Sequence, residues 1–283
     1  MKGILVINKD GGMTSGAVVS KVRYILGTKK VGHFGTLDPQ GTGVLALGIG
    51  KATRLFDYFL DKDKEYLAEF EFGKLTDTLD GEGKILETTT VIPTKTQIEK
   101  ALSKFVGVID QVPPQFSAKS VNGVRAYSVA RKGGAVELKP CKVTVNKFEL
   151  VKQTKESTYL FKIECSSGTY IRSLCRDLAV SLKSLAIMTS ICRTRSGQFL
   201  EKNSVTIEEL KELKDKAILT LDSVLDDLDR RDFDEALYDK IINGVKIDTE
   251  ISNSPFKIYC KDELIGIGKE KEGKLKIVTF LKD

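Results

Sequence analysis

The order of strand and helix patterns along the chain limits its possible folds more than any other feature. Residues 66–72 (YLAEFEF) alternate apolar and acidic side chains, which predicts a half-buried strand with Tyr66 and Phe70 on its inner face. Residues 141–151 and 158–166 read as two successive strands, like a hairpin. Such adjacent strands favour an α+β fold with a mixed, largely antiparallel sheet flanked by helices over a doubly wound parallel sheet.

Helices are expected between these strands, from helical spacing of apolar residues and from capping patterns. The expected ranges are 15–27, 94–107, 170–182 and 205–213. Ser15 is placed to cap the first helix. Thr94 with Gln97, and Thr206 with Glu209, form capping-box patterns.

An acidic stretch marks the expected domain boundary. Residues 222–239 hold eight acidic side chains against two arginines. Short strands and glycine turns follow it, which predicts a small β-rich module. We therefore expect a domain over residues 1–225 and a smaller one over residues 230–283.

The net charge of +6 is unevenly distributed. Residues 116–155 contain nine basic side chains, opposed only by Glu137 and Glu149. A local basic block of this kind is a candidate phosphate-binding surface, with a solvated lysine-rich face as the alternative.

Composition excludes several classes of function. No apolar run approaches the ~18 to 20 residues of a membrane span, and the first residues do not form a secretory signal. Five scattered cysteines without a CxxC pair indicate reduced thiols in a cytoplasm. His33 is the only histidine, which excludes a histidine-rich metal site and leaves general acid–base chemistry mainly to other side chains.

Residues 31–54 (VGHFGTLDPQGTGVLALGIGKATR) contain the first candidate for chemistry, Asp38. Pro39 biases Asp38 away from helical backbone angles, and the surrounding glycines allow another backbone to approach closely. A carboxylate on such a loop can act as a nucleophile or a base, although Asp-Pro in a glycine-rich loop is often only a turn. A phosphate-binding GxxxxGK[ST] loop is absent, since Ala52 follows Gly50 and Lys51.

Residues 166–178 (SSGTYIRSLCRDL) form the second candidate segment. Tyr170 and Arg172 open a helix directly after a strand, from where side chains can reach a cleft. Arg172 could pair with a buried carboxylate, lowering its pKa and fixing its orientation. The alternative is a core tyrosine beside a surface arginine.

Taken together, these segments resemble the TruB-type tRNA pseudouridine synthases. The matching motifs, in order, are INKDGGMTS (7–15), GHFGTLDPQGTGVL (32–45), KEYLAEFEFGKLTDTLDGEG (64–83), SGTYIRSLCRDL (167–178) and CRTRSGQF (192–199). The resemblance covers residues 1 to about 215. The C-terminal residues resemble, less closely, the small RNA-binding PUA module that bacterial members often carry.

The resemblance implies isomerisation of uridine 55 in the tRNA T loop to pseudouridine, without a metal or organic cofactor. It implies that Asp38 is the catalytic carboxylate, as nucleophile or base, and that Arg172 pairs with it. Tyr66 is expected to stack on the target base, with proton removal from C5 as a further candidate role. Tyr170 and Ile191 are expected to line the pocket, and His33 to contact RNA near the flipped nucleotide.

The resemblance also implies how the RNA is held. Extruding a base costs a few kcal/mol, which stacking on aromatic and apolar walls offsets. The basic block at 116–155 is then expected to clamp the T arm. The predicted RNA contacts are Lys9, Lys64, Arg125, Arg131, Lys132 and Arg193.

Two other functions remain open at this stage. One is an RNA-binding folding chaperone that grips the T arm with secondary or no catalysis. The other is a dyskerin-like synthase that needs protein and guide-RNA partners. The intact set of candidate side chains argues against loss of catalysis, and the short C-terminal module with the complete clamp segment favours stand-alone action. The resemblance suggests a monomer whose partner is tRNA.

Overall fold

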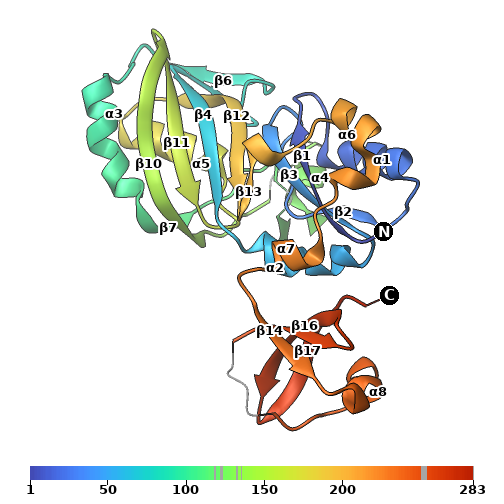
Figure 1. Cartoon of the computed structure of the whole chain (residues 1–283). Helices are drawn as coiled ribbons and strands as arrows, with labels where there is room; N and C mark the ends of the chain where they lie inside the picture. Colours follow the sequence, from blue (N-terminus) through green and yellow to red (C-terminus); the bar gives the residue numbers. More distant parts are fainter. Residues whose placement is uncertain (118, 122–123, 132, 135, 250–253, 283) are drawn as a thin grey trace.

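The computed structural model describes residues 1–117, 119–121, 124–131, 133–134, 136–249 and 254–282. A large mixed sheet dominates the fold, with the order β1-β3-β12-β4-β11-β10-β7 (Figure 1). Neighbouring strands pair antiparallel except β3 and β12, which pair in parallel. The bounds are β1 (Gly3–Lys9), β3 (Thr42–Ile49), β12 (Ala186–Ser196), β4 (Lys64–Phe72), β11 (Thr158–Cys165), β10 (Cys141–Lys155) and β7 (Gly107–Gln111), with β2 (Val31–His33) beside β3 and β13 (Phe199–Leu200) beside β12.

The predicted mixed, largely antiparallel sheet is confirmed, and so is the alternation along β4. Tyr66, Ala68 and Phe70 point into the core while the intervening residues are half-buried. The predicted strand pair at 141–166 is present as β10 and β11, joined by a short turn.

Helices cover the sheet in two groups. Helix α5 (Ile171–Ser181) and α3 (Lys95–Leu102) pack on the core that contains Phe70 and Phe161. Helix α1 (Ser15–Leu26) and α6 (Ile207–Leu213) pack on β1 and β3. The remaining short elements are α2 (Phe56–Leu60), α4 (Ala126–Ala130), α7 (Leu221–Val224), η1 (Gly50–Leu55), η2 (Ser103–Phe105), η3 (Glu201–Asn203), η4 (Lys214–Ala217), β5 (Lys74–Thr76), β6 (Ile85–Thr88), β8 (Ser120–Val121) and β9 (Val124–Arg125).

Both predicted capping boxes are confirmed, at Thr94 and Thr206. The predicted cap of the first helix was wrong by one residue. Thr14 accepts the hydrogen bond from the amide of Ala17, and Ser15 is the first helical residue, buried against the loop that carries Asp38.

A second, smaller sheet begins within the acidic stretch, with the order β14-β15-β16-β17. It has its own apolar core and lies beside the large sheet as a separate lobe (Figure 1). Ile267 and Leu281 dock it on Leu55 and Phe59, and Arg54 donates to the carbonyl of Phe280 at 3.0 Å. Its elements are β14 (Asp229–Phe233), η5 (Glu235–Leu237), α8 (Tyr238–Ile242), β15 (Phe256–Cys260), β16 (Glu263–Lys271) and β17 (Lys274–Phe280).

Candidate active site

The loop that carries Asp38 joins β2 to β3, and buried groups hold its backbone. The hydroxyl of Ser15 accepts from the amide of Leu37 at 2.9 Å and donates to its carbonyl at 3.0 Å. The amide of Gly41 donates to the carbonyl of Asp38 at 2.9 Å, closing a turn around Pro39. The Asp38 side chain itself is 41% exposed. The backbone is therefore fixed while the carboxylate stays accessible.

Lys9, at the end of β1, ties this turn to the segment before α1. Its side chain is fully buried, and its ammonium group donates to three backbone carbonyls. These belong to Asp10, Met13 and Pro39, at 2.9, 2.7 and 2.8 Å. An ammonium with all three protons bound in this way acts as a fixed internal brace.

Arg193, on β12, braces the other side of the same loop. Its guanidinium donates to the carbonyls of Val44 at 2.7 Å and of Thr36 and Gly35 at 3.3 Å. Gly43 lets the backbones of β3 and β12 approach closely, because a Cβ there would lie 2.4 Å from the backbone carbonyl oxygen of Arg193. The parallel contact of β3 with β12 thus depends on a glycine.

Arg172, on α5, meets Asp38 directly and is 7% exposed. Its Nη2 lies 3.2 Å from Oδ1 and 3.0 Å from Oδ2 of Asp38. The same guanidinium donates to the carbonyls of Thr78 and Phe116, each at 3.0 Å. Arg172 therefore orients the Asp38 carboxylate and joins it to the loop after β5 and to the start of the predicted clamp.

Asp80 is a member of this network that the sequence analysis missed. Its Oδ2 lies 3.6 Å from Nη1 of Arg172. Its Oδ1 accepts from the hydroxyl of Thr78 at 2.5 Å and from the amide of Glu82 at 3.1 Å. The segment TDTLDGEG holds several acidic residues, and nothing in their spacing singles out Asp80.

Of the predicted wall residues, two share an apolar cluster with the loop that carries Asp38. Tyr66 on β4 and Ile191 on β12 belong to the same apolar cluster as Leu37, the residue before Asp38. Tyr170 precedes α5, and its backbone is clamped by Gln111, whose side chain accepts from its amide at 2.8 Å and donates to its carbonyl at 3.2 Å. No pattern in the sequence singles out Gln111.

His33 lies at the end of β2, opposite Leu47 of β3. Its Nδ1 is buried and has no hydrogen-bond partner among the residues that the structure describes. Burial, with the nearby charge of Arg193, lowers the pKa of the imidazole, so the ring is neutral at neutral pH.

Burial raises the pKa of both candidate reactive groups, the Asp38 carboxyl and the Tyr66 phenol. Protein atoms displace water from one side of Asp38 and raise the pKa of its carboxyl, while Arg172 opposes this effect and Asp80 adds to it. Burial raises the pKa of the Tyr66 phenol, which is therefore protonated at neutral pH.

Three of the predicted RNA contacts need correction. Lys9, Lys64 and Arg193 are 0%, 5% and 2% exposed, and their cationic groups bind backbone carbonyls. They brace the site from inside because their charged ends do not reach the surface. Arg131, another predicted RNA contact, lies on the surface, with its guanidinium 5.1 Å from the ring centre of Tyr127. Lys132 and the side chain of Arg125 lie outside the described residues.

Within the described ranges, no three His, Cys, Asp or Glu side chains are grouped so as to hold a metal ion. Nor does this part of the chain contain a helix long and apolar enough to cross a membrane.

Comparison with known proteins adds sequence and structural relatives. Residues 23–171 match the family described as TruB family pseudouridylate synthase (N terminal domain), and residues 172–243 match the tRNA pseudouridylate synthase B C-terminal domain. A protein of Caldanaerobacter subterraneus subsp. tengcongensis named tRNA pseudouridine synthase B is 41% identical, over 97% of both chains. A Clostridium kluyveri protein of the same name is 40% identical, over 99% of both chains.

Solved structures with the same fold include one in an H/ACA RNP bound to a substrate RNA containing 2'-deoxyuridine. It superposes with a TM-score of 0.73 at 22% identity, over 99% of this chain and 85% of that one. A chain of a Cbf5-Nop10-Gar1 complex gives the same TM-score at 24% identity, over 99% of this chain and 84% of the other. At these identities the likeness shows the fold alone.

Proposed function

Because the chain belongs to the TruB family of pseudouridylate synthases, we infer that it is an isomerase that converts uridine in tRNA to pseudouridine. We propose uridine 55 of the T loop as the target. In this reaction the N1–C1′ bond breaks, a C5–C1′ bond forms, and the proton at C5 is lost while N1 gains one. The reaction is redox-neutral, so it needs no electron carrier.

The proposal that Asp38 carries the chemistry rests on one observation. Its carboxylate is partly exposed on a rigid loop, and Arg172 holds both of its oxygens at 3.0–3.2 Å. A carboxylate oriented in this way can attack the sugar or remove a proton from it. Both routes begin from the ionised form of Asp38, which Arg172 favours.

The walls of the site suit a base that has left its stack. Tyr66 and Ile191 offer an aromatic and an apolar surface, as expected for an extruded base. Because its raised pKa keeps the phenol protonated at neutral pH, we assign Tyr66 to stacking and assign no proton removal to its phenolate. We propose that Tyr170 lines the same pocket and that neutral His33 contacts the RNA beside it.

We further propose that the enzyme acts alone on the T arm of tRNA, as a monomer in the cytoplasm. The surface position of Arg131 supports a clamp that includes residues 116–155. We assign residues 1–225 to catalysis and residues 230–283 to a PUA-like RNA-binding domain, which the separate apolar core of the second sheet supports.

The test is tritium release from a T-arm stem-loop labelled at C5 of uridine, for the natural chain and for Asp38→Asn. Release by the natural chain alone is the expected result. Equal release by both would remove Asp38 from the mechanism. Binding without release would favour the folding chaperone, and release only with added guide RNA and proteins would favour the guide-dependent synthase.

A further inference from the structure

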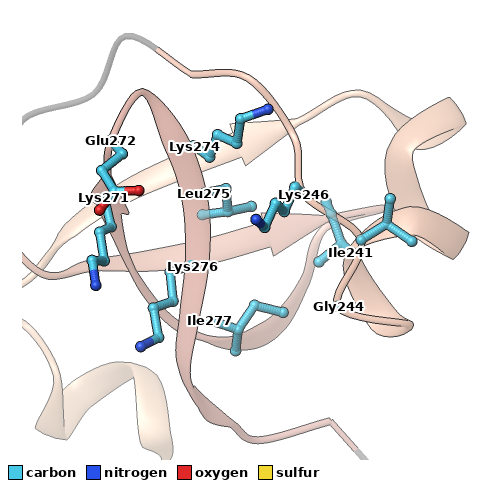
Figure 2. Close-up of a pocket in the computed structure, with 10 residues that line it drawn as sticks. Ile241, Gly244, Lys246, Lys271, Glu272, Lys274, Leu275, Lys276 and Ile277 are labelled. Atoms are coloured by element: carbon cyan, nitrogen blue, oxygen red, sulfur yellow. The ribbon is translucent and has the colours of Figure 1, made fainter.

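Two pockets of the structure differ in where they lie and in what lines them. A groove of about 360 Å³ in the smaller lobe is lined by lysines around Leu275 and Ile277 (Figure 2). It belongs with the RNA-binding role already proposed for residues 230–283. A second pocket, of about 290 Å³, lies in the large domain between β7, β10 and the turn before α5. Gln111 and Tyr170 both line it, so it adjoins the candidate active site.

Helix α5, which carries Arg172, begins without a local cap. Its N-cap residue is Tyr170, whose side chain makes no capping hydrogen bond. N-cap positions favour short side chains with an oxygen that accepts from the first-turn amides, and a tyrosine cannot fill that role. The residue three positions on, Ser173, gives its hydroxyl to the carbonyl of Val112 at 2.8 Å instead of reaching back. Helices α3 and α6, in contrast, both close capping boxes with their own side chains. The chain therefore keeps a large aromatic side chain where helix stability favours a small polar one.

Gln111, on the edge strand β7, supplies the missing partner from 59 positions away. Its Oε1 accepts from the amide of Tyr170 at 2.8 Å, and its Nε2 donates to the carbonyl of Tyr170 at 3.2 Å. The Gln111 side chain is 1% exposed, so water cannot replace either hydrogen bond. Both polar groups of the Tyr170 backbone are then fixed, which sets the direction in which its side chain leaves the chain.

The segment that follows β7 leads into the predicted clamp and is tied to the same helix. The carbonyl of Val112 accepts from Ser173 at 2.8 Å and from Arg176 at 3.0 Å. The carbonyl of Phe116 accepts from Arg172 at 3.0 Å. Because these bonds hold the start of the clamp against the start of α5, the position of the helix depends on where the clamp begins.

We propose that Gln111 is a positioning residue for the reaction, which holds Tyr170 in the orientation that lines the uridine pocket. The proposal rests on the proposed function, which places Tyr170 at that pocket. The role of Gln111 is indirect, because its polar atoms bind the Tyr170 backbone and not the carboxylate of Asp38. Since the Gln111 side chain is buried away from the RNA, its loss should slow the reaction on bound RNA and leave the affinity for RNA unchanged.

The test variant is Gln111→Met, which keeps an unbranched side chain and loses both hydrogen bonds. The matched control is Gln115→Met. Gln115 holds the backbone of Val136 in the same way, accepting from its amide at 3.0 Å and donating to its carbonyl at 2.9 Å. Val136 lies in the predicted clamp and not on α5. Single-turnover tritium release from saturating T-arm stem-loop gives the rate on bound RNA, a titration gives the affinity, and thermal melting verifies folding.

We expect Gln111→Met to lower the saturating rate by roughly 10- to 100-fold, as for a side chain displaced by about 1 Å, while RNA affinity is unchanged. Gln115→Met should keep the saturating rate. In a Tyr170→Ala background, Gln111→Met should cause no further loss, because its effect passes through Tyr170. Additive losses in this double-mutant cycle would overturn the proposal, as would a full rate in Gln111→Met or equal rate losses in the two methionine variants.

Hydrogen–deuterium exchange separates this outcome from a failure of the proposed function. In folded Gln111→Met the peptide that contains the Tyr170 amide should exchange faster than in the natural chain, and Gln115→Met should leave its exchange unchanged. Absence of tritium release by the natural chain would count against the proposed function. Faster exchange would then still support the hold of Gln111 on Tyr170, and unchanged exchange would overturn the proposal with or without turnover.

Discussion

Replacing Arg172 with methionine gives the sharpest test of the site, because this guanidinium touches Asp38, Thr78 and Phe116 at once. Methionine fills similar space without charge or donors. The carbonyls of Thr78 and Phe116 lose their 3.0 Å partner, and the Asp38 carboxylate loses its counterion. Since Arg172 is what lowers the pKa of Asp38 against the effect of burial, that pKa should rise further in the variant.

The size of the effect follows from the burial of the pair. Breaking a fully buried ion pair costs about 3–5 kcal/mol, but Asp38 is 41% exposed and water can replace part of the interaction. We therefore expect a loss of about 2–3 kcal/mol in transition-state stabilisation, or roughly 30- to 150-fold in single-turnover rate at pH 7. The acid limb of the pH–rate profile should move to higher pH, because the variant needs less acidic conditions to ionise Asp38.

The assay is single-turnover tritium release between pH 5 and pH 9, alongside thermal melting. The matched control is Arg176→Met on the same helix, where Arg176 pairs with Asp177 at 2.8 Å instead of with Asp38. The control should leave the acid limb in place. An unchanged acid limb in a folded Arg172→Met enzyme would mean that Asp38 is not the group that titrates in the reaction.

Further predictions concern the groups around this pair. Asp80→Asn should slow turnover about 10-fold while RNA binding stays intact, since Arg172 loses a charged neighbour at 3.6 Å; single-turnover kinetics with a binding titration will check this. Lys9→Met should lower the free energy of unfolding by about 2 kcal/mol in a urea titration, because three carbonyls lose their donor. Burial lowers the pKa of Lys64 to about 8, so between about pH 8 and 10.5 the unfolded chain binds more protons than the folded one. Stability should therefore gain up to about 3 kcal/mol across that range relative to Lys64→Met, and parallel slopes for the two proteins would contradict this.

The sequence predicted the helices and strands better than it predicted which lysines and arginines are internal. The alternation along residues 66–72 and the capping boxes are local patterns, and local patterns survive into the fold. Whether a lysine is internal depends on how distant segments pack over it: the Lys9 ammonium binds two nearby carbonyls and that of Pro39, 30 residues away, and the sequence alone predicts a surface contact. The same limit hid Gln111 and Asp80, which have defined partners only once the 77–84 loop, β7 and α5 meet.

The parallel contact of β3 with β12 has a consequence for how the enzyme becomes active during synthesis. The hydroxyl of Thr42 reaches the carbonyl of Ile191, and Arg193 reaches that of Val44, each across 149 positions of chain. Such contacts raise the contact order and close late, after shorter-range hairpins such as β10–β11. The Asp38 loop therefore leaves the ribosome early but gains its brace only after the third quarter of the chain has folded. An incomplete chain could collapse and even hold RNA, yet it would lack the geometry for turnover, so catalytic activity reports on the completion of folding.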